Sequence, residues 1–194
     1  MPRSRLATLL LLLAAALLLA AAGPASAQWP GHGRHHAVGA CSSSHADVRP
    51  GAVSRSRDAT LCLLNRVRSR HRLPPLRLDA KLSRAARLHS RDMVRHRYFA
   101  HDSRNGRSPF DRMRATHYVP RNASWWLGEN IGWGAGTLAQ PIAMVRAWMH
   151  SPPHRENILN RHFRDVGIGI AVGAPVSGDW GGGATYTTDF GQHS

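Results

Sequence analysis

The chain has 194 residues and two cysteines, which suits one domain of ordinary size, and after the N-terminus no segment is apolar enough to span a bilayer. Its formal net charge of +15 would attract nucleic acid, anionic lipid or an acidic cell-wall polymer, but the charge comes from arginines scattered along the chain, with Lys81 the only lysine. This spread indicates a coding bias, so we expect no specific nucleic-acid binding and keep an anionic cell-wall polymer or lipid as the alternative partner.

Residues 1–27 are typical of a secretory signal peptide. Two arginines precede the Leu/Ala run Leu6–Ala22, and Ala25-Ser26-Ala27 provides a small-residue cleavage site. A retained membrane anchor is the alternative, but the run is short for ~30 Å of hydrocarbon and is followed at once by a Gly-Pro pair. We therefore predict cleavage before Gln28 and a secreted, extracytoplasmic chain with no transmembrane segment after cleavage.

Residues 28–56 form a basic leader rich in Gly, Ser, His and Arg, for which we expect a flexible chain. Its fixed point would be a disulfide between Cys41 and Cys62, because a pair of cysteines in an exported protein usually forms one, and the closed loop adds about 3 kcal/mol of stability. A free catalytic thiol is the alternative, although Cys62 lies in an apolar run. We interpret the His32–His36 cluster as solvated and basic, with weak metal binding as the alternative.

Apolar residues at three- and four-residue spacing, each stretch opened by a capping residue, predict four helices. They run from Asp58 to about His71, from Asp79 to about His96, from Ser108 to about Thr116, and from Thr137 to about His150. Prolines end the first and the fourth of these helices, at Pro74 and Pro152. Residues 117–136 hold several glycines and three tryptophans, and we expect them to be irregular.

The C-terminal part of the chain changes to strand patterns. Residues 166–172 alternate branched with small side chains, residues 185–190 are rich in Thr and Tyr, and a Gly-rich segment joins them. Such a pair predicts two antiparallel strands. Helices followed by short strands predict an α+β domain over residues 57–194, in which the helices cover a small antiparallel sheet.

Three short stretches could carry chemistry: Tyr98–Ser103, Gly128–Ile131 and Trp148–Leu159. Taken alone, each has an ordinary explanation as a helix cap or a loop hydrogen-bond acceptor. His150 and His154 have the spacing of the zinc motif H-E-x-x-H, but prolines stand between them and no Glu occupies the position of the general base. We therefore reject that motif.

Taken together and in this order, these stretches resemble the CAP superfamily (SCP-like extracellular domains, which include cysteine-rich secretory proteins, antigen 5 and pathogenesis-related 1 proteins), and its bacterial branch most of all. The resemblance covers about residues 58–191. Its most specific stretches are Tyr98-Phe99-Ala100-His101, Ser108-Pro109-Phe110-Asp111-Arg112, Gly128-Glu129-Asn130-Ile131, Trp148–Leu159 and Thr187–Gly191. The resemblance implies an α-β-α sandwich with a central cleft.

In many members of that superfamily the cleft holds two histidines and two acidic residues. The resemblance places the two histidines at His101 and His154 and one acid at Glu129. Ser151 stands where eukaryotic members have the second acid, so any mechanism that needs two carboxylates loses one of them. The resemblance also makes zinc a cofactor candidate, with His101 and His154 as ligands.

Three functions remain open at this stage. A ligand- or metal-binding module would use the cleft for zinc, a small molecule or a lipid. A zinc- or His-dependent hydrolase would use Glu129 as general base beside a zinc-bound water, or His101 and His154 as acid and base. In the third, the same residues form a buried hydrogen-bond network that only supports the loops.

Overall fold

A computed structural model describes residues 40–194 except for residues 121, 179 and 181. The predicted signal peptide and the first part of the leader, with its His32–His36 cluster, lie outside the described residues. The helices are α1 (Val53–Arg70), α2 (Ala80–His96), α3 (Pro109–Ala115), α4 (Pro141–His150) and α5 (Pro152–Leu159), with the 3-10 turns η1 (Pro50–Ala52) and η2 (Gly136–Ala139). The strands are β1 (Arg77–Leu78), β2 (Trp125–Ala135), β3 (Asp165–Val172) and β4 (Gly183–His193).

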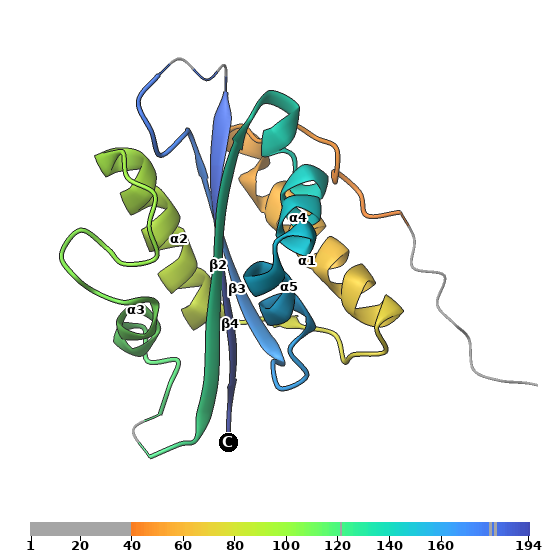
Figure 1. The fold of residues 1–194 in the computed structure, drawn as a ribbon, viewed down its shortest axis with the longest axis vertical. Helices are drawn as coiled ribbons and strands as arrows, with labels where there is room; N and C mark the ends of the chain where they lie inside the picture. The colour runs from red at the N-terminus through yellow and green to blue at the C-terminus, as the bar shows by residue number, and fades with distance from the viewer. Residues whose placement is uncertain (1–39, 121, 179, 181) are drawn as a thin grey trace, which may run out of the picture. The chain divides into compact units, whose positions relative to one another are not determined.

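The described residues form three layers, with a four-stranded sheet in the middle (Figure 1). The strand order is β1-β3-β4-β2, with β4 antiparallel to both of its neighbours and β1 parallel to β3. Helices α2 and α3 cover one face, and α1, α4 and α5 cover the other. The predicted α+β sandwich is confirmed. The sheet is mixed rather than purely antiparallel, since β1 runs parallel to β3. Strand β1 was not predicted because two residues are too short to leave a pattern in the sequence.

Helix α2 lies directly on the backbone of β3. A Cβ atom at Gly167 would lie 2.1 Å from the carbonyl carbon of Leu82, and one at Gly169 would lie 2.2 Å from that of Ala86. Both distances are far inside van der Waals contact, so only glycine permits this approach. The inner side of α2, which carries the buried His89, is thereby held close to the middle of the sheet.

The face of the sheet under α1, α4 and α5 holds the larger hydrophobic core. Its buried side chains include Leu64, Trp148, Val166, Tyr186 and Phe190. The indole N–H of Trp148 donates to the carbonyl of Ile131 at 3.0 Å, and the hydroxyl of Tyr186 donates to the carbonyl of Ala139 at 2.7 Å. The polar ends of both large rings are therefore satisfied within the core.

The guanidinium of Arg68, in α1, is fully buried and connects three segments. Its nitrogens donate at 2.8 to 3.0 Å to carbonyl oxygens of four residues: Pro74, Ile158, Asn160 and Phe163. Burial, and then the charge of Arg164, lower the pKa of Arg68 to about 10, so it stays charged at neutral pH. Arg68 thereby ties α1 to the linker that follows it and to the end of α5.

Two of the predicted helices are confirmed with their caps. The Asp79 side chain accepts from the backbone N–H groups of Lys81 and Leu82 and opens α2. Ser108 and Asp111 form a capping box at the start of α3. The predicted antiparallel strand pair is confirmed as β3 and β4.

The first helix begins earlier than predicted. Helix α1 starts at Val53, so the end of the predicted leader is helical, and Asp58 lies inside the helix beside Arg57 instead of capping it. The residue before the helix is Ala52, which has no side chain that could cap, so no sequence signal marks the true start. The predicted disulfide is confirmed, and it joins Cys41 to Cys62 in α1.

The prediction that residues 117–136 are irregular is wrong for residues 125–135, which form β2. The glycines that suggested irregular chain face two helices. A Cβ at Gly128 would lie 2.7 Å from the amide oxygen of Asn157 in α5, and one at Gly132 would lie 2.4 Å from the sulfur of Met144 in α4. These glycines allow close packing of helices on a regular strand.

The predicted fourth helix consists of the turn η2, which contains Thr137, followed by α4, which begins at Pro141. Pro152 does more than end it. Pro152 occupies the first turn of α5, where the missing N–H would have had no helical partner, and so it opens a helix that was not predicted. In the part of the chain that the structure describes, no helix has the length and hydropathy needed to cross a membrane.

Candidate functional site

The candidate residues lie on both sides of the edge strand β2. Because Gly128 and Gly132 face α5 and α4, the alternation of side chains along a strand directs Glu129 to the opposite face, toward α2 and α3. His101, in the loop after α2, contacts Glu129 on that face, whereas His154 belongs to α5 on the other. The two histidines therefore approach one strand from opposite layers.

Glu129 is a buried carboxylate with both oxygens engaged. Its side chain is 2% exposed; Oε1 lies 2.8 Å from Nδ1 of His101, and Oε2 accepts from Nη2 of Arg112 at 2.6 Å. Burial alone would raise the pKa of Glu129, but the hydrogen bond with His101 and the charge of Arg112 outweigh it and hold that pKa below its usual value. Glu129 is therefore ionised at neutral pH.

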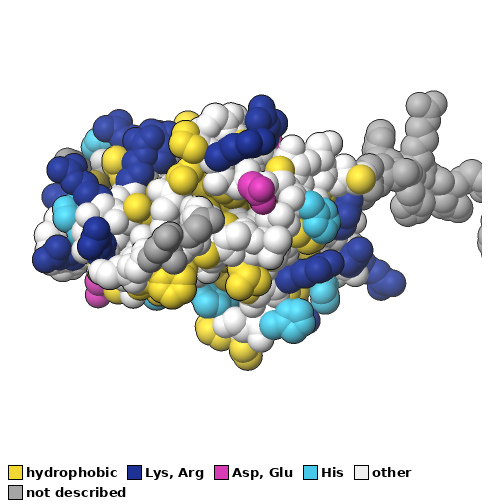
Figure 2. All heavy atoms as spheres, turned by 90° about the horizontal axis from the view of Figure 1, so that it is seen from above, with side chains coloured by type: hydrophobic (Ala, Val, Ile, Leu, Met, Phe, Trp, Pro, Cys, Tyr) yellow, Lys and Arg dark blue, Asp and Glu magenta, His cyan; other side chains and the backbone are white. Residues whose placement is uncertain are grey.

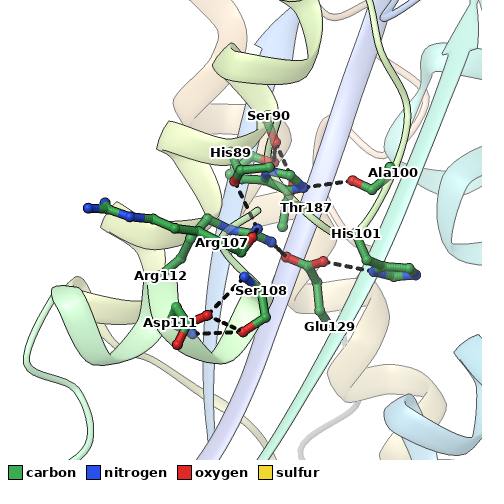
Figure 3. A network of polar contacts seen from close by, with 12 residues as sticks. His89, Ser90, Ala100, His101, Arg107, Ser108, Asp111, Arg112, Glu129 and Thr187 are labelled. Atoms are coloured by element: carbon green, nitrogen blue, oxygen red, sulfur yellow. Dashed lines mark hydrogen bonds and ion pairs between the residues drawn. The ribbon is translucent and has the colours of Figure 1, made fainter. Parts of the chain in front are cut away.

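His101 is oriented by this carboxylate. Since an ionised Glu129 can only accept, the Nδ1 of His101 carries the proton that forms their hydrogen bond. Figure 3 shows the ring of His101 on the side of Glu129 away from Arg112. The side chain of His101 is 51% exposed, and its Nε2 has no hydrogen-bond partner among the described residues. A half-exposed imidazole with a fixed tautomer presents an open lone pair.

His154 is fixed in a similar way from the other layer. Its Nδ1 lies 2.7 Å from the hydroxyl of Ser151, the residue between α4 and α5. Partial burial, and then the nearby His101, lower the pKa of His154, so its neutral form prevails at neutral pH. Ser151, which replaces the second acid of the resemblance, thus acts as the hydrogen-bond partner of this imidazole.

Two amide side chains hold α5 against β2. Asn130, whose neighbour is Glu129, donates to the backbone carbonyl of His154 at 3.0 Å. Asn157 donates to the backbone carbonyl of Glu129 at 3.1 Å and to the amide oxygen of Asn130 at 2.9 Å. These bonds fix the segment that carries His154 relative to the strand that carries Glu129.

A cavity of about 260 Å³ lies along the β2 edge beside His154. Its lining includes Phe99, Trp133, Met144, Ser151 and His154, but neither His101 nor Glu129. A larger hollow of about 640 Å³ lies at the outer side of α4 and α5 and contains none of the three candidate residues. Of these two cavities, the smaller one touches the candidate site, through Ser151 and His154.

Behind Glu129 lie two buried residues whose part in the site was not recognised from the sequence. Arg112 donates from Nη1 to the hydroxyl of Ser103 and the carbonyl of Arg107, at 3.1 Å each, in addition to its bond with Glu129 (Figure 3). The Nε2 of His89 lies 3.0 Å from the carbonyl of Ala100, and burial lowers the pKa of this imidazole. The signal for Arg112 was present, since it ends the stretch Ser108–Arg112.

The sequence profile described as the cysteine-rich secretory protein family (CAP) matches residues 61–188, the segment that supplies His101, Glu129 and His154. The chain belongs to this family. The B. subtilis (strain 168) uncharacterized protein YkwD is 40% identical over 127 residues, which cover 66% of this chain and 47% of YkwD. The uncharacterized membrane protein YlbC of the same strain is 31% identical over 132 residues, which cover 63% of this chain and 36% of YlbC. The chain thus spans about half or less of these relatives.

Solved structures agree with the family assignment. An extracellular protein containing a SCP domain from Bacillus anthracis str. Ames superposes with a TM-score of 0.57 at 30% identity, covering 74% of this chain and 43% of that chain. An outer surface protein of Borrelia burgdorferi superposes with a TM-score of 0.51 at 20% identity, covering 68% of this chain and 88% of that chain. The second similarity shows the fold alone.

The donor atoms of this CAP domain fit a zinc ion only in part. Within the described residues no group of three or more His, Cys, Asp or Glu side chains is placed to hold a metal ion. Glu129 is engaged by His101 and Arg112, which leaves the Nε2 atoms of His101 and His154 as donors. The carboxylate on Nδ1 of His101 is the partner that zinc-binding histidines usually have. The described residues therefore form no closed structural zinc site, and an ion held by these histidines would need its other ligands from solution.

Proposed function

We propose that this CAP domain is an extracellular binding module whose site is formed by His101 and His154 at the β2 edge, with zinc as the first ligand to test. The observation that supports this proposal most directly is that the Nδ1 of each histidine has a hydrogen-bond partner, while neither Nε2 has one among the described residues. Imidazoles held in this way lose little freedom when they bind a metal or a polar ligand.

Export of the chain is supported by two observations. The first 27 residues have the pattern of a signal peptide. A similar structure, 30% identical, is that of a protein described as extracellular. We therefore place this binding module outside the cytoplasm.

Hydrolysis by Glu129 is the weaker alternative. A general base needs an acceptor atom within reach of the water that it activates. The carboxylate of Glu129 is almost fully buried, and its two oxygens are engaged by His101 and Arg112. This arrangement supports Glu129 as the residue that orients His101. Bound zinc would supply a Lewis acid beside this pair.

Binding of an anionic polymer through the basic surface is the other alternative. Figure 2 shows the Lys and Arg side chains of one face in several separate groups with few acidic side chains between them. A polymer site would be expected to gather its cations along one path. The cleft therefore remains the better-supported site.

The test is a zinc titration by calorimetry near pH 7.5, on the secreted chain with His32, His35 and His36 replaced by alanine. We expect saturable binding of one zinc ion per chain that is lost in the H101A/H154A variant, because both nitrogens are then removed. Binding should weaken below pH 6, since protons compete for the same imidazoles.

The matched control is H150A. His150 lies at the end of α4, is exposed, and has Nδ1 2.8 Å from the carbonyl of Arg146. Zinc binding should be the same in H150A as in the parent chain. No binding in the parent chain, or binding that survives in H101A/H154A, would contradict the zinc form of the proposal, and lipid and polymer ligands would be titrated next.

A further inference from the structure

Asp189 in β4 is a buried carboxyl group for which the proposed function has no use. In the register of the sheet it lies directly opposite Glu129, and directly opposed residues of antiparallel strands point to the same face. The residue is 1% exposed, and neither carboxyl oxygen has a hydrogen-bond donor within the described residues. A buried ionised carboxylate without donors would be costly, so this group needs an explanation.

The neighbours of Asp189 do not provide the missing donors. Arg112 directs Nη1 to Ser103 and Arg107 and Nη2 to Glu129, while its Nε has no acceptor. If Asp189 were ionised, that free N–H would be expected to turn toward it. On the other side of Asp189, strand β3 contributes Gly167, which has no side chain.

The side chain that faces Asp189 from the neighbouring strand is that of Glu129, its direct partner in the antiparallel register. Two ionised carboxylates repel each other, so a close approach is a hydrogen bond only when one of them carries a proton. The remaining titratable groups around the pair are His89 from α2, Arg112 from α3 and, beyond Glu129, His101. Glu129 is already stabilised as an anion by Arg112 and His101, which leaves Asp189 as the place for the proton.

We propose that Glu129 and Asp189 share one proton, which rests on Asp189, and that Asp189 is a positioning residue for the cleft. The neutral acid donates an O–H to Glu129, so the pair carries one negative charge, which Arg112 balances. The site thus contains a second acid after all, on β4 instead of at Ser151, and in protonated form. The pKa directions agree: burial, and then the charge of Glu129, raise the pKa of Asp189 well above its usual value.

This inference goes beyond the proposed function and does not depend on it, because it concerns the buried side of Glu129 and not the ligand of His101 and His154. Its consequence is electrostatic: the buried side of Glu129 carries a single negative charge, which Arg112 balances.

The test is the stability of Asp189→Asn, measured by urea unfolding of the secreted, disulfide-bonded chain from pH 5 to pH 8. The amide imitates the neutral acid and keeps a donor for Glu129. A carboxyl group whose folded pKa is raised contributes full stability below its unfolded pKa and loses it as pH rises toward the folded pKa. We therefore expect D189N to be more stable than wild type, with the ratio of their unfolding constants growing about tenfold per pH unit.

The matched control is Thr188→Val. Thr188 is the preceding residue of β4 and is buried, and its hydroxyl also has no partner, but it does not titrate and faces the other side of the sheet. Its effect on stability should not vary with pH. A D189N protein that is less stable than wild type at pH 8, that does not fold, or whose difference from wild type is independent of pH would overturn the proposal.

A spectroscopic measurement on the folded protein gives a second test. The infrared spectrum of wild type at pH 7, minus that of D189N, should contain the carbonyl band of a protonated carboxylic acid, because only wild type has this group. Absence of that band in wild type would show Asp189 to be ionised and would also overturn the proposal. Neither test uses zinc, so failure here and failure of the binding proposal can be told apart.

Discussion

Replacing Arg68 by methionine tests whether one buried guanidinium holds the helices of the larger core in place. Methionine fills similar volume but donates nothing, so four carbonyl oxygens lose the bond from Arg68, and that of Phe163 keeps a second donor, Nη1 of Arg164. An orphaned buried carbonyl costs about 1–3 kcal/mol. Removing a buried charge returns several kcal/mol of desolvation, so we take the lower end for each of the other three carbonyls and expect stability to fall by about 3 kcal/mol.

Such a loss is a large part of the roughly 5–15 kcal/mol by which a domain is stable. Urea unfolding with the disulfide intact measures it, and with a slope of about 2 kcal/mol per molar the midpoint would fall by about 1.5 M. Arg68→Lys should lie in between, because an ammonium group has only three donors at one point.

The control for Arg68→Met is Arg55→Met in the same helix, where the side chain is exposed and the expected change is within about 0.5 kcal/mol. If Arg68→Met changes stability by less than about 1 kcal/mol, the carbonyls have found other partners. The assignment of Arg68 as the connection between α1 and the end of α5 would then be refuted.

Three further changes have expected outcomes. Gly167→Ala should lower the free energy of unfolding in urea by about 3 kcal/mol or more, since its Cβ would lie 2.1 Å from Leu82. Gly51→Ala is the control, because a Cβ there has nothing within 4 Å and should leave stability nearly unchanged. Equal effects of the two substitutions would contradict the close packing of α2. Cys41→Ser should lose about 3 kcal/mol, and reductant should lower wild type to the same level; a midpoint unchanged by reductant would contradict this. Glu129→Gln should lose about 3–5 kcal/mol at pH 7 because Arg112 loses its counter-charge. The folded pKa of Glu129 is lowered, so its stabilising contribution is present above the unfolded pKa and disappears as pH falls. The stability difference between wild type and Glu129→Gln should therefore shrink below about pH 4. A difference that stays constant from pH 3 to pH 7 would contradict the ion pair.

Local signals in the sequence were sufficient for α2 and α3, because each helix starts at a capping side chain that the residue types reveal. They were insufficient for α1, whose start has no capping side chain, and for β2. The glycines of β2 are explained by helices that are distant in sequence, and Gly128 and Gly132 resemble loop residues until α4 and α5 are in place. A propensity for irregular chain was overridden there by tertiary packing.

The candidate site was predictable only as far as the family resemblance extends. His101, Glu129 and His154 came from that resemblance, and the structure adds which of their atoms are engaged and which are open. The pairing of Glu129 with Asp189 depends on strand register, which the sequence pattern did not define. A single Asp among threonines gives no sign that its side chain lies against another carboxylate.

The contact between α2 and the glycines of β3 has a consequence for protein engineering. Because the helix contacts bare backbone at Gly167 and Gly169, its height above the sheet is set by main-chain atoms and does not follow changes in nearby side-chain volume. A library aimed at new ligands can therefore vary cavity-lining positions such as Phe99 and Met144 without shifting this helix. The two glycine codons are the ones that such a library should leave unchanged.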